Sequence, residues 1–327
     1  MDVSSTVWYV TIGALVVFLI LDVGVIARRP HVPTMKECAI ALAFYVGAAV
    51  LFGIWVGWNS GGQYAGEFFA GWLTEYSLSI DNLFVFLLIM RRFLVPDQLQ
   101  QEALLIGIII AIVLRGIFIA LGAAIINEFA WVFYVFGLFL VYTAVKLVRD
   151  HQSEAEEFEE NGLLRWVKRR FRVTPDFDGA KIATRIDGKR LLTPMFIVIV
   201  ALGTTDLLFA LDSIPAIYGL TREPYLVLTA NIFALMGLRQ LYFLIGGLLE
   251  RLVYLSYGLA VLLAFIGVKL VMHALHENNL PFVNGGEPVA VPEIPITVSL
   301  GAIVVILGVT TVASLIKSAR DGSRAQA

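Results

Sequence analysis

Two short segments of the chain carry the same pattern of polar side chains in the middle of long apolar runs. Residues 75–83 (EYSLSIDNL) and 206–214 (DLLFALDSI) each have an acid, an aspartate six positions later, and then a small amide or hydroxyl side chain. An ionised carboxylate inside a membrane costs roughly 2.5–3.5 kcal/mol on insertion scales, so such acids indicate function. The matching residues are Glu75, Asp81 and Asn82 in the first segment and Asp206, Asp212 and Ser213 in the second. Two copies with one spacing predict a single site assembled from two repeats.

The ligands that these motifs offer are nearly all oxygen atoms, from carboxylates, hydroxyls and an amide. Such sets suit Mn²⁺, Mg²⁺ or Ca²⁺, whereas Zn²⁺ and Cu²⁺ prefer imidazole or thiolate. The four histidines lie outside both motifs, and the single cysteine, Cys38, cannot form a thiolate cluster by itself. His273 and His276, about one helical turn apart, are either a peripheral metal site or ordinary interfacial histidines. The motifs therefore predict a site for a hard divalent cation.

Helical geometry decides which motif side chains point the same way. At about 100° per residue, the first acid and the residues four and seven positions after it share a face, while the second acid points about 120° away. The residues on the shared faces are Glu75, Ser79 and Asn82 in one copy and Asp206, Ala210 and Ser213 in the other. The two acids of one motif converge only if the helix breaks between them. Pro215 could cause a break in the second copy, because it deprives the Leu211 carbonyl of its helical donor.

Several charged side chains outside the motifs also fall within apolar runs. Arg115 and Arg239 lie well inside them and are either counter-ions to the carboxylates when no metal is bound or permanent ion-pair partners that hold helices together. Lys146 and Lys269 lie nearer the ends, where a long side chain can reach the interface. Asp22, toward the end of the first run, is either an entrance ligand or an interfacial acid.

The composition and its arrangement predict an integral membrane protein made of helices. The 327 residues are 59% hydrophobic and 15% charged, with a mean hydropathy of +0.83, whereas soluble domains are about 25% charged. The apolar residues form runs of about 20 or more, long enough to span a bilayer, and not the short alternating segments of a β-barrel. We predict an all-α polytopic bundle of one domain, residues 1–327, with about nine spans. They are residues 7–27, 37–58, 67–90, 101–123, 129–149, 193–220, 224–248, 251–276 and 293–317.

Basic residues in the predicted loops indicate the orientation. Nineteen of the 24 lysines and arginines lie in loops on one side, and the opposite side has only Arg222. Positive charge marks the cytoplasmic side, so we expect the amino terminus outside and the carboxyl terminus inside. The hydrophilic segment 150–190 is then cytoplasmic. It is either a solvated linker or, around Trp166, a short amphipathic helix on the inner leaflet.

The similarity between the two halves extends beyond the acidic motifs. Residues 115–122 (RGIFIALG) resemble 239–246 (RQLYFLIG), and a Val-Lys-Leu triplet recurs near the end of each half. We therefore predict a repeat of three spans, about 67–149 and about 193–276. Because three is odd, the copies would cross the membrane in opposite directions, as in many secondary transporters. The alternative is an old duplication that keeps no symmetric mechanism.

These motifs resemble those of the TerC/Alx family of integral membrane proteins, associated with tellurium resistance. The stretches that match are EYSLSIDNLFVF at 75–86, FALDSIPA at 209–216 and NIFALMGLR at 231–239. The resemblance implies a bacterial inner-membrane protein that exports Mn²⁺, with an ion site of Asp81, Asn82, Asp212 and Ser213 and with Glu75 and Asp206 beside it. The chain departs from the family pattern at Gly203, where an acid is usual, and one carboxylate fewer would change metal choice or proton coupling.

The sequence thus predicts a secondary transporter that exports a divalent cation, most simply Mn²⁺, with proton exchange as a further hypothesis. The alternative is a membrane accessory or assembly protein without transport, linked to tellurite or metal stress. No Ser/His pair, zinc-protease motif or cofactor fingerprint lies in the spans, so we expect no enzyme activity and no permanently bound cofactor. The expected partners are the lipid bilayer and the transported cation, and not nucleic acid. The oligomeric state stays open.

Overall fold

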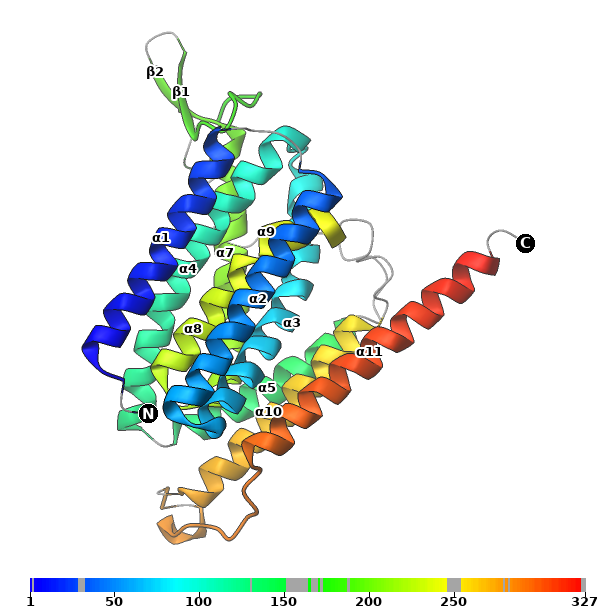
Figure 1. Ribbon diagram of the computed structural model, residues 1–327. Coiled ribbons are helices and arrows are strands. Elements are labelled where there is room, and N and C mark those ends of the chain that lie inside the picture. Colours follow the sequence, from blue (N-terminus) through cyan, green and yellow to red (C-terminus); the bar gives the residue numbers. More distant parts are fainter. Residues whose placement is uncertain are drawn as a thin grey trace.

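The computed structural model is a bundle of long helices with a small hairpin at one end (Figure 1). It describes residues 1, 3–28, 33–129, 131–150, 164–165, 170, 173–186, 189–245, 254–278, 280–281 and 283–324. The first five helices are α1 (Ser5–Arg28), α2 (Met35–Ser60), α3 (Gly62–Arg92), α4 (Asp97–Glu128) and α5 (Val132–Asp150). After strands β1 (Ala183–Ile186) and β2 (Lys189–Leu192) come α7 (Pro194–Tyr218), α8 (Pro224–Met236), α9 (Leu238–Ile245), α10 (Leu255–His276), the short 3₁₀ helix η2 (Asn284–Gly286) and α11 (Ile296–Arg324).

The predicted fold class is confirmed. Within the described residues, eight helical segments are long and apolar enough to cross a membrane. The remaining predicted span corresponds to α1, which contains a shorter apolar helical segment, Ser5–Phe18. The seventh span is divided at Gly237, where α8 ends and α9 begins. A β-carbon at Gly237 would lie 2.9 Å from the Leu42 side chain, so glycine allows α2 to pack closely at this junction.

The strands found among the described residues lie in the predicted cytoplasmic segment. Strands β1 and β2 pair antiparallel, with Arg185 opposite Arg190, and form a hairpin that the sequence analysis did not predict. Trp166, the centre of the amphipathic helix suggested there, lies outside the described residues. The hairpin and the amino terminus are at opposite ends of the bundle (Figure 1). In the predicted orientation, the hairpin end would be cytoplasmic.

The helices pack in pairs across the two halves of the chain. Helix α3 packs on α8, α4 on α7, and α5 on α10. The α5–α10 contact is especially close, because a β-carbon on Gly137 or on Gly267 would come within 2.7–2.8 Å of the carbonyl oxygen of the other glycine. The first span of each half thus packs on the second span of the other half, and the two third spans pack on each other. An inverted repeat of three spans would produce this pairing, although the repeat itself stays a prediction.

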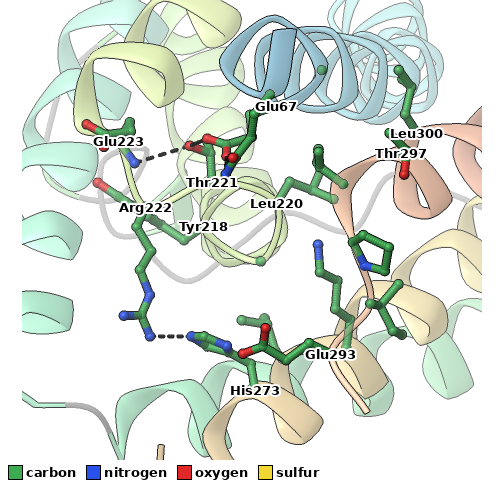
Figure 2. A pocket seen from close by; sticks show the side chains of 18 of the residues that line it. Glu67, Tyr218, Leu220, Thr221, Arg222, Glu223, His273, Glu293, Thr297 and Leu300 are labelled. Carbon is green, nitrogen blue, oxygen red and sulfur yellow. Dashed lines mark hydrogen bonds between the residues drawn. The ribbon is translucent and has the colours of Figure 1, made fainter. Parts of the chain in front are cut away.

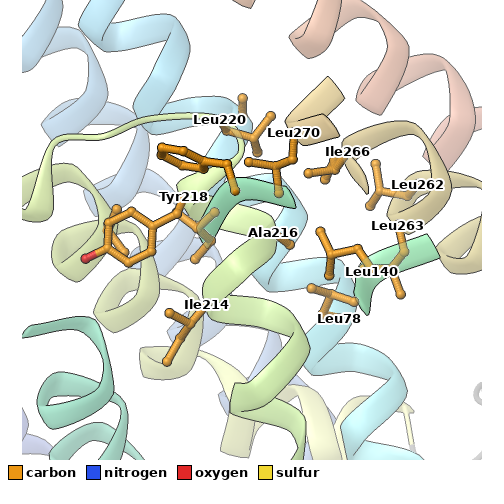
Figure 3. Packing of buried hydrophobic residues seen from close by; sticks show 14 of the residues in the cluster. Leu78, Leu140, Ile214, Ala216, Tyr218, Leu220, Leu262, Leu263, Ile266 and Leu270 are labelled. Atoms are coloured by element: carbon orange, nitrogen blue, oxygen red, sulfur yellow. The ribbon is translucent and has the colours of Figure 1, made fainter. Parts of the chain in front are cut away.

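Apolar side chains fill the space between the central helices. Leu78, Leu140, Ile214 and Ile266 come from α3, α5, α7 and α10 and lie together in one cluster (Figure 3). The span formed by α8 and α9 is 89% buried and that of α11 only 11%, so the former is central and the latter peripheral. Exposed apolar side chains on peripheral helices are expected where lipid is the solvent.

Candidate cation site

The centre of the site is Arg115, whose side chain is fully buried on α4. Its Nε donates to Asp206 Oδ2 at 3.1 Å and its Nη2 to Asp206 Oδ1 at 2.9 Å, a bidentate pairing. Its Nη1 contacts Glu75 Oε1 and donates to Ser213 Oγ at 3.3 Å. The guanidinium therefore joins α3, α4 and α7, and it brings together the leading acids of the two motifs.

The local sequence explains why these side chains face inward. Both motif segments lie in regular α-helix, and the residues four and seven positions after each leading acid are buried with it. The buried residues are Glu75, Ser79 and Asn82 on α3 and Asp206, Ala210 and Ser213 on α7. This confirms the helical faces predicted from spacing.

The charges at this centre do not balance. Glu75 and Asp206 are buried together on one guanidinium, so the three groups carry a formal charge of −1 when all are ionised. An uncompensated buried charge costs several kcal/mol in a protein interior. The arrangement thus favours binding of a proton or a metal cation nearby.

Other buried polar atoms near the motifs lack hydrogen-bond partners within the described part of the chain. They include Thr74 Oγ1 and Ser79 Oγ on α3 and Asn231 Nδ2 on α8. Buried polar groups are nearly always satisfied by protein, water or an ion, so each of these needs a partner. The Ser79 oxygen, on the buried face of the first motif, is chemically suited to a hard cation.

The expected break at Pro215 is wrong. Helix α7 runs without interruption from Pro194 to Tyr218 and includes the proline. Since Pro215 lies in the last turn, it removes a single helical donor, and its own carbonyl still accepts from Gly219 N at 2.9 Å. The Tyr218 hydroxyl also donates to the Ile119 carbonyl of α4 at 2.6 Å, which holds this end of the helix in place.

Because α7 is continuous, its two acids face different surroundings. Asp206 is buried against Arg115, whereas Asp212 is only partly buried on another side of the helix. The side chains of Asp81 and Asp22 lie outside the described residues. Among the side chains that are described, no three or more His, Cys, Asp or Glu residues gather closely enough to hold a metal ion. The predicted six-residue ligand set therefore stays a prediction.

The second intramembrane arginine is also buried. Arg239, on α9, exposes 7% of its surface and has an interaction partner in the structure.

For Arg115, the observed ion pairs agree with either predicted role, counter-ion to the carboxylates or permanent ion-pair partner that holds helices together. The two differ only in whether the pairs open when a cation binds.

The histidines at the far end of α10 do not form a metal cluster in the described region. His273 contacts Arg222 and packs edge-on against Phe133, and His276 Nε2 lies 3.4 Å from Glu293 Oε1. Each imidazole thus has its own neighbours, as expected of interfacial histidines.

The sequence of this chain matches a known family of membrane proteins. Residues 60–322 match the family described as "Integral membrane protein TerC family". The chain belongs to the TerC family. The match begins at the end of α2 and includes both acidic motifs and both buried arginines.

TerC relatives cover nearly the whole chain. An uncharacterized membrane protein of Mycobacterium tuberculosis is 48% identical over 317 residues, which are 96% of this chain and 80% of the relative. One of Myxococcus xanthus is 39% identical over 315 residues, 96% of this chain and 93% of the relative. A protein of Escherichia coli named "Putative membrane-bound redox modulator Alx" is 37% identical over 303 residues, 90% of this chain and 89% of the relative. No solved structure matches the chain.

Gly203, where the resemblance leads us to expect an acid, is tightly packed. A β-carbon at Gly203 would lie 3.2 Å from Ile110 Cγ2, on α4. A longer acidic side chain at this position would need α4 to shift or Ile110 to change rotamer. Glycine therefore allows the close contact between α7 and α4 at this position.

The structure also reveals an acid that sequence analysis did not consider. Glu67 lies on α3, eight positions before Glu75, and exposes only 8% of its surface. It lines a cavity at the end of the bundle where α3 begins and α7 ends. The signal that could have found it is an acid within the same apolar run as the first TerC motif.

Proposed function

We propose that this TerC protein is a secondary transporter that exports a divalent cation, Mn²⁺ above all, across the bacterial plasma membrane. The observation that carries the proposal is the burial of Glu75 and Asp206, from two similar motifs, on the single guanidinium of Arg115. Two carboxylates and one fixed cation form a site that needs further positive charge. A membrane protein without transport has no evident need for such an arrangement.

Formal charges support a divalent cargo. The four motif acids and the two intramembrane arginines carry a net charge of −2, which one divalent cation or two protons would neutralise. Loading with either would neutralise these six groups, and this suggests exchange of two protons for one metal ion. Efflux that is unaffected by collapse of the proton gradient would contradict the exchange.

In the proposed cycle, the described conformation is the one in which Arg115 occupies the carboxylates. Arrival of the cation draws Glu75 and Asp206 away from the guanidinium, and Asp81, Asn82, Asp212 and Ser213 complete the ligand set. Movement of one repeat against the other then opens the site to the opposite side. The amino terminus would be outside, and the 150–190 segment and carboxyl terminus would be cytoplasmic.

The rival is an accessory role. The Escherichia coli relative is named as a membrane-bound redox modulator. This chain has a single cysteine, the buried Cys38, so a dithiol pair within one chain is not available for such a role. An accessory protein would tolerate neutral substitutions of the motif acids with no loss beyond stability.

The deciding experiment measures total cell manganese by mass spectrometry in a manganese-sensitive host that lacks its own exporter. Cells would carry the wild type, Asp81→Asn, Asp212→Asn, an empty vector, or the control Asp178→Asn, in an exposed segment near the hairpin. We expect the wild type and the control to lower manganese equally, and both motif variants to match the vector at equal membrane expression. Equal manganese in wild-type and vector cells would contradict Mn²⁺ export.

A further inference from the structure

A cavity of about 730 Å³ lies at the end of the bundle opposite the hairpin. Its walls are the start of α3, the loop between α7 and α8, the last turns of α10 and the segment leading into α11 (Figure 2). By the predicted orientation, this end faces outward. The cavity contains charged side chains of both signs, and their pairing decides which of them is available to a ligand.

Most of the acids around the cavity already lie beside a basic group. Glu223 Oε1 lies 2.5 Å from the Met1 amino group, and Glu293 Oε1 lies 3.4 Å from His276 Nε2. Glu277, beside the cavity, contacts Arg222. Among the described acids of this cavity, Glu67 instead accepts hydrogen bonds from neutral groups, Thr221 and Gln63.

The surroundings of Glu67 resemble a cation site rather than a structural ion pair. Its Oε2 accepts from the Thr221 hydroxyl at 2.6 Å, and its Oε1 accepts from Gln63 Nε2 at 3.1 Å. The Thr221 oxygen and the Gln63 amide oxygen are themselves ligands that hard divalent cations accept. A buried carboxylate that accepts hydrogen bonds from these two neutral groups, on the wall of an open cavity, is therefore suited to bind such an ion once Gln63 turns its amide oxygen toward it.

A positively charged side chain lines the same cavity as Glu67. Lys269 of α10 lines the same cavity, its Nζ donates to Ser299 Oγ at 3.0 Å, and it lies within electrostatic range of Glu67. The prediction that Lys269 simply reaches the interface is thus incomplete, because its ammonium is directed into the protein. The hydrogen bond to the neutral Ser299 hydroxyl leaves the positive charge of Lys269 without a carboxylate partner among the described residues.

Helices α3 and α7 contribute residues to both the cavity and the central site. Glu67 and Glu75 are on α3, eight residues or about 12 Å of helix apart. Thr221 follows the carboxyl end of α7, which carries Asp206 and Ser213. The Glu67–Thr221 contact therefore joins the outer ends of the two helices whose motif acids meet at Arg115.

We propose that Glu67, with Thr221 and Gln63, is an outer binding station for the exported divalent cation, and that Lys269 competes with the cation for Glu67. This inference rests on the proposed function for the direction of transport. The carboxylate would receive the ion from the central site. The ammonium would keep its affinity low, so that the ion leaves to the outside and does not return readily.

The test is equilibrium binding of Mn²⁺ alone to the purified full-length protein in lipid nanodiscs, with free Mn²⁺ measured by electron paramagnetic resonance. The variants are Glu67→Gln, Lys269→Met and Asp212→Asn, with Glu223→Gln as a control acid on the wall of the same cavity. We expect the wild type to bind two Mn²⁺ ions and Glu67→Gln to bind one fewer. Lys269→Met should bind the outer ion about tenfold more tightly, because a nearby like charge is removed.

The outcomes separate this inference from the proposed function. Unchanged stoichiometry in Glu67→Gln, or unchanged affinity in Lys269→Met, overturns the outer station even if export is intact. Loss of binding in Asp212→Asn with the Glu67-dependent ion retained supports two separate sites. If Glu67→Gln does not fold, Thr221→Val keeps the carboxylate and removes one oxygen ligand. It should weaken the outer ion alone, and wild-type binding by this variant would overturn the proposal.

Discussion

Glu75 and Asp206 are 131 positions apart in the chain and contact the same guanidinium, that of Arg115. Each acid opens one of two similar motifs, and the motifs lie on different helices, α3 and α7. The contact therefore links the two halves of the chain at a buried point. The three side chains together carry a formal charge of −1, so the stability of this ion pair depends on whether a proton or cation binds nearby.

The charge count predicts the order of stability among variants of this centre. Arg115→Gln leaves two buried carboxylates without a partner and should lose about 3–5 kcal/mol of stability. Asp206→Asn leaves a neutral Glu75–Arg115 pair and should be much milder. Thermal unfolding of the purified proteins in one detergent measures both. If Asp206→Asn proved as destabilising as Arg115→Gln, the charge imbalance would not be the governing feature.

Metal addition should stabilise the wild type. A ligand at 100 times its dissociation constant adds about 2.7 kcal/mol to the stability of the folded state. We expect Mn²⁺ to raise the unfolding temperature of the wild type in a saturable way, and chelation to reverse the effect. Asp212→Asn should lose most of this shift, whereas the exposed-site control Asp178→Asn should keep it. Equal shifts in all three proteins would indicate non-specific binding.

The close crossing of α5 and α10 predicts intolerance of even one methyl group. In Gly267→Ala the new β-carbon would meet Gly137 O at 2.8 Å and Val141 Cγ2 at 2.9 Å. Overpacking of this kind costs about 1–3 kcal/mol. The control is Gly47→Ala on α2, where nothing lies within 4 Å, and where alanine should be neutral or stabilising by up to ~1 kcal/mol. A Gly267→Ala protein as stable as Gly47→Ala would contradict the observed crossing.

Glu277, directly after α10, forms a pH-dependent ion pair with Arg222. Burial raises the pKa of Glu277, but the hydrogen bond and charge of Arg222 outweigh it and hold the pKa below the ordinary 4.5. A depressed pKa in the folded state stabilises the protein above about pH 4.5, and this stabilisation is lost as the pH falls further. Glu277→Gln should therefore cost about 0.2–1 kcal/mol at pH 7, as for exposed pairs, and progressively less as the pH falls below 4.5. Thermal unfolding against pH measures it, with the exposed Glu287→Gln as the control.

Much of this protein follows from the sequence alone. Each of the nine spans that hydropathy predicted contains a helix in the described part of the chain, because a segment in lipid must satisfy its own backbone and can do so locally. Helical spacing predicted which motif residues are buried together, such as Glu75 with Ser79, since the 100° step is a property of the helix itself. The repeated motifs also indicated the family, which the comparison confirmed.

Only the tertiary structure decided which groups meet. No local signal shows that Arg115 would take the leading acids of both motifs, or that Glu67 would meet Thr221, because these contacts depend on how helices pack. Packing is governed by close approach at glycines and by the need to pair buried charges, both of which join residues distant in the chain. For the same reason Pro215 could not be judged from sequence. A proline breaks a helix or is absorbed by it according to what surrounds it, and here α7 continues to Tyr218.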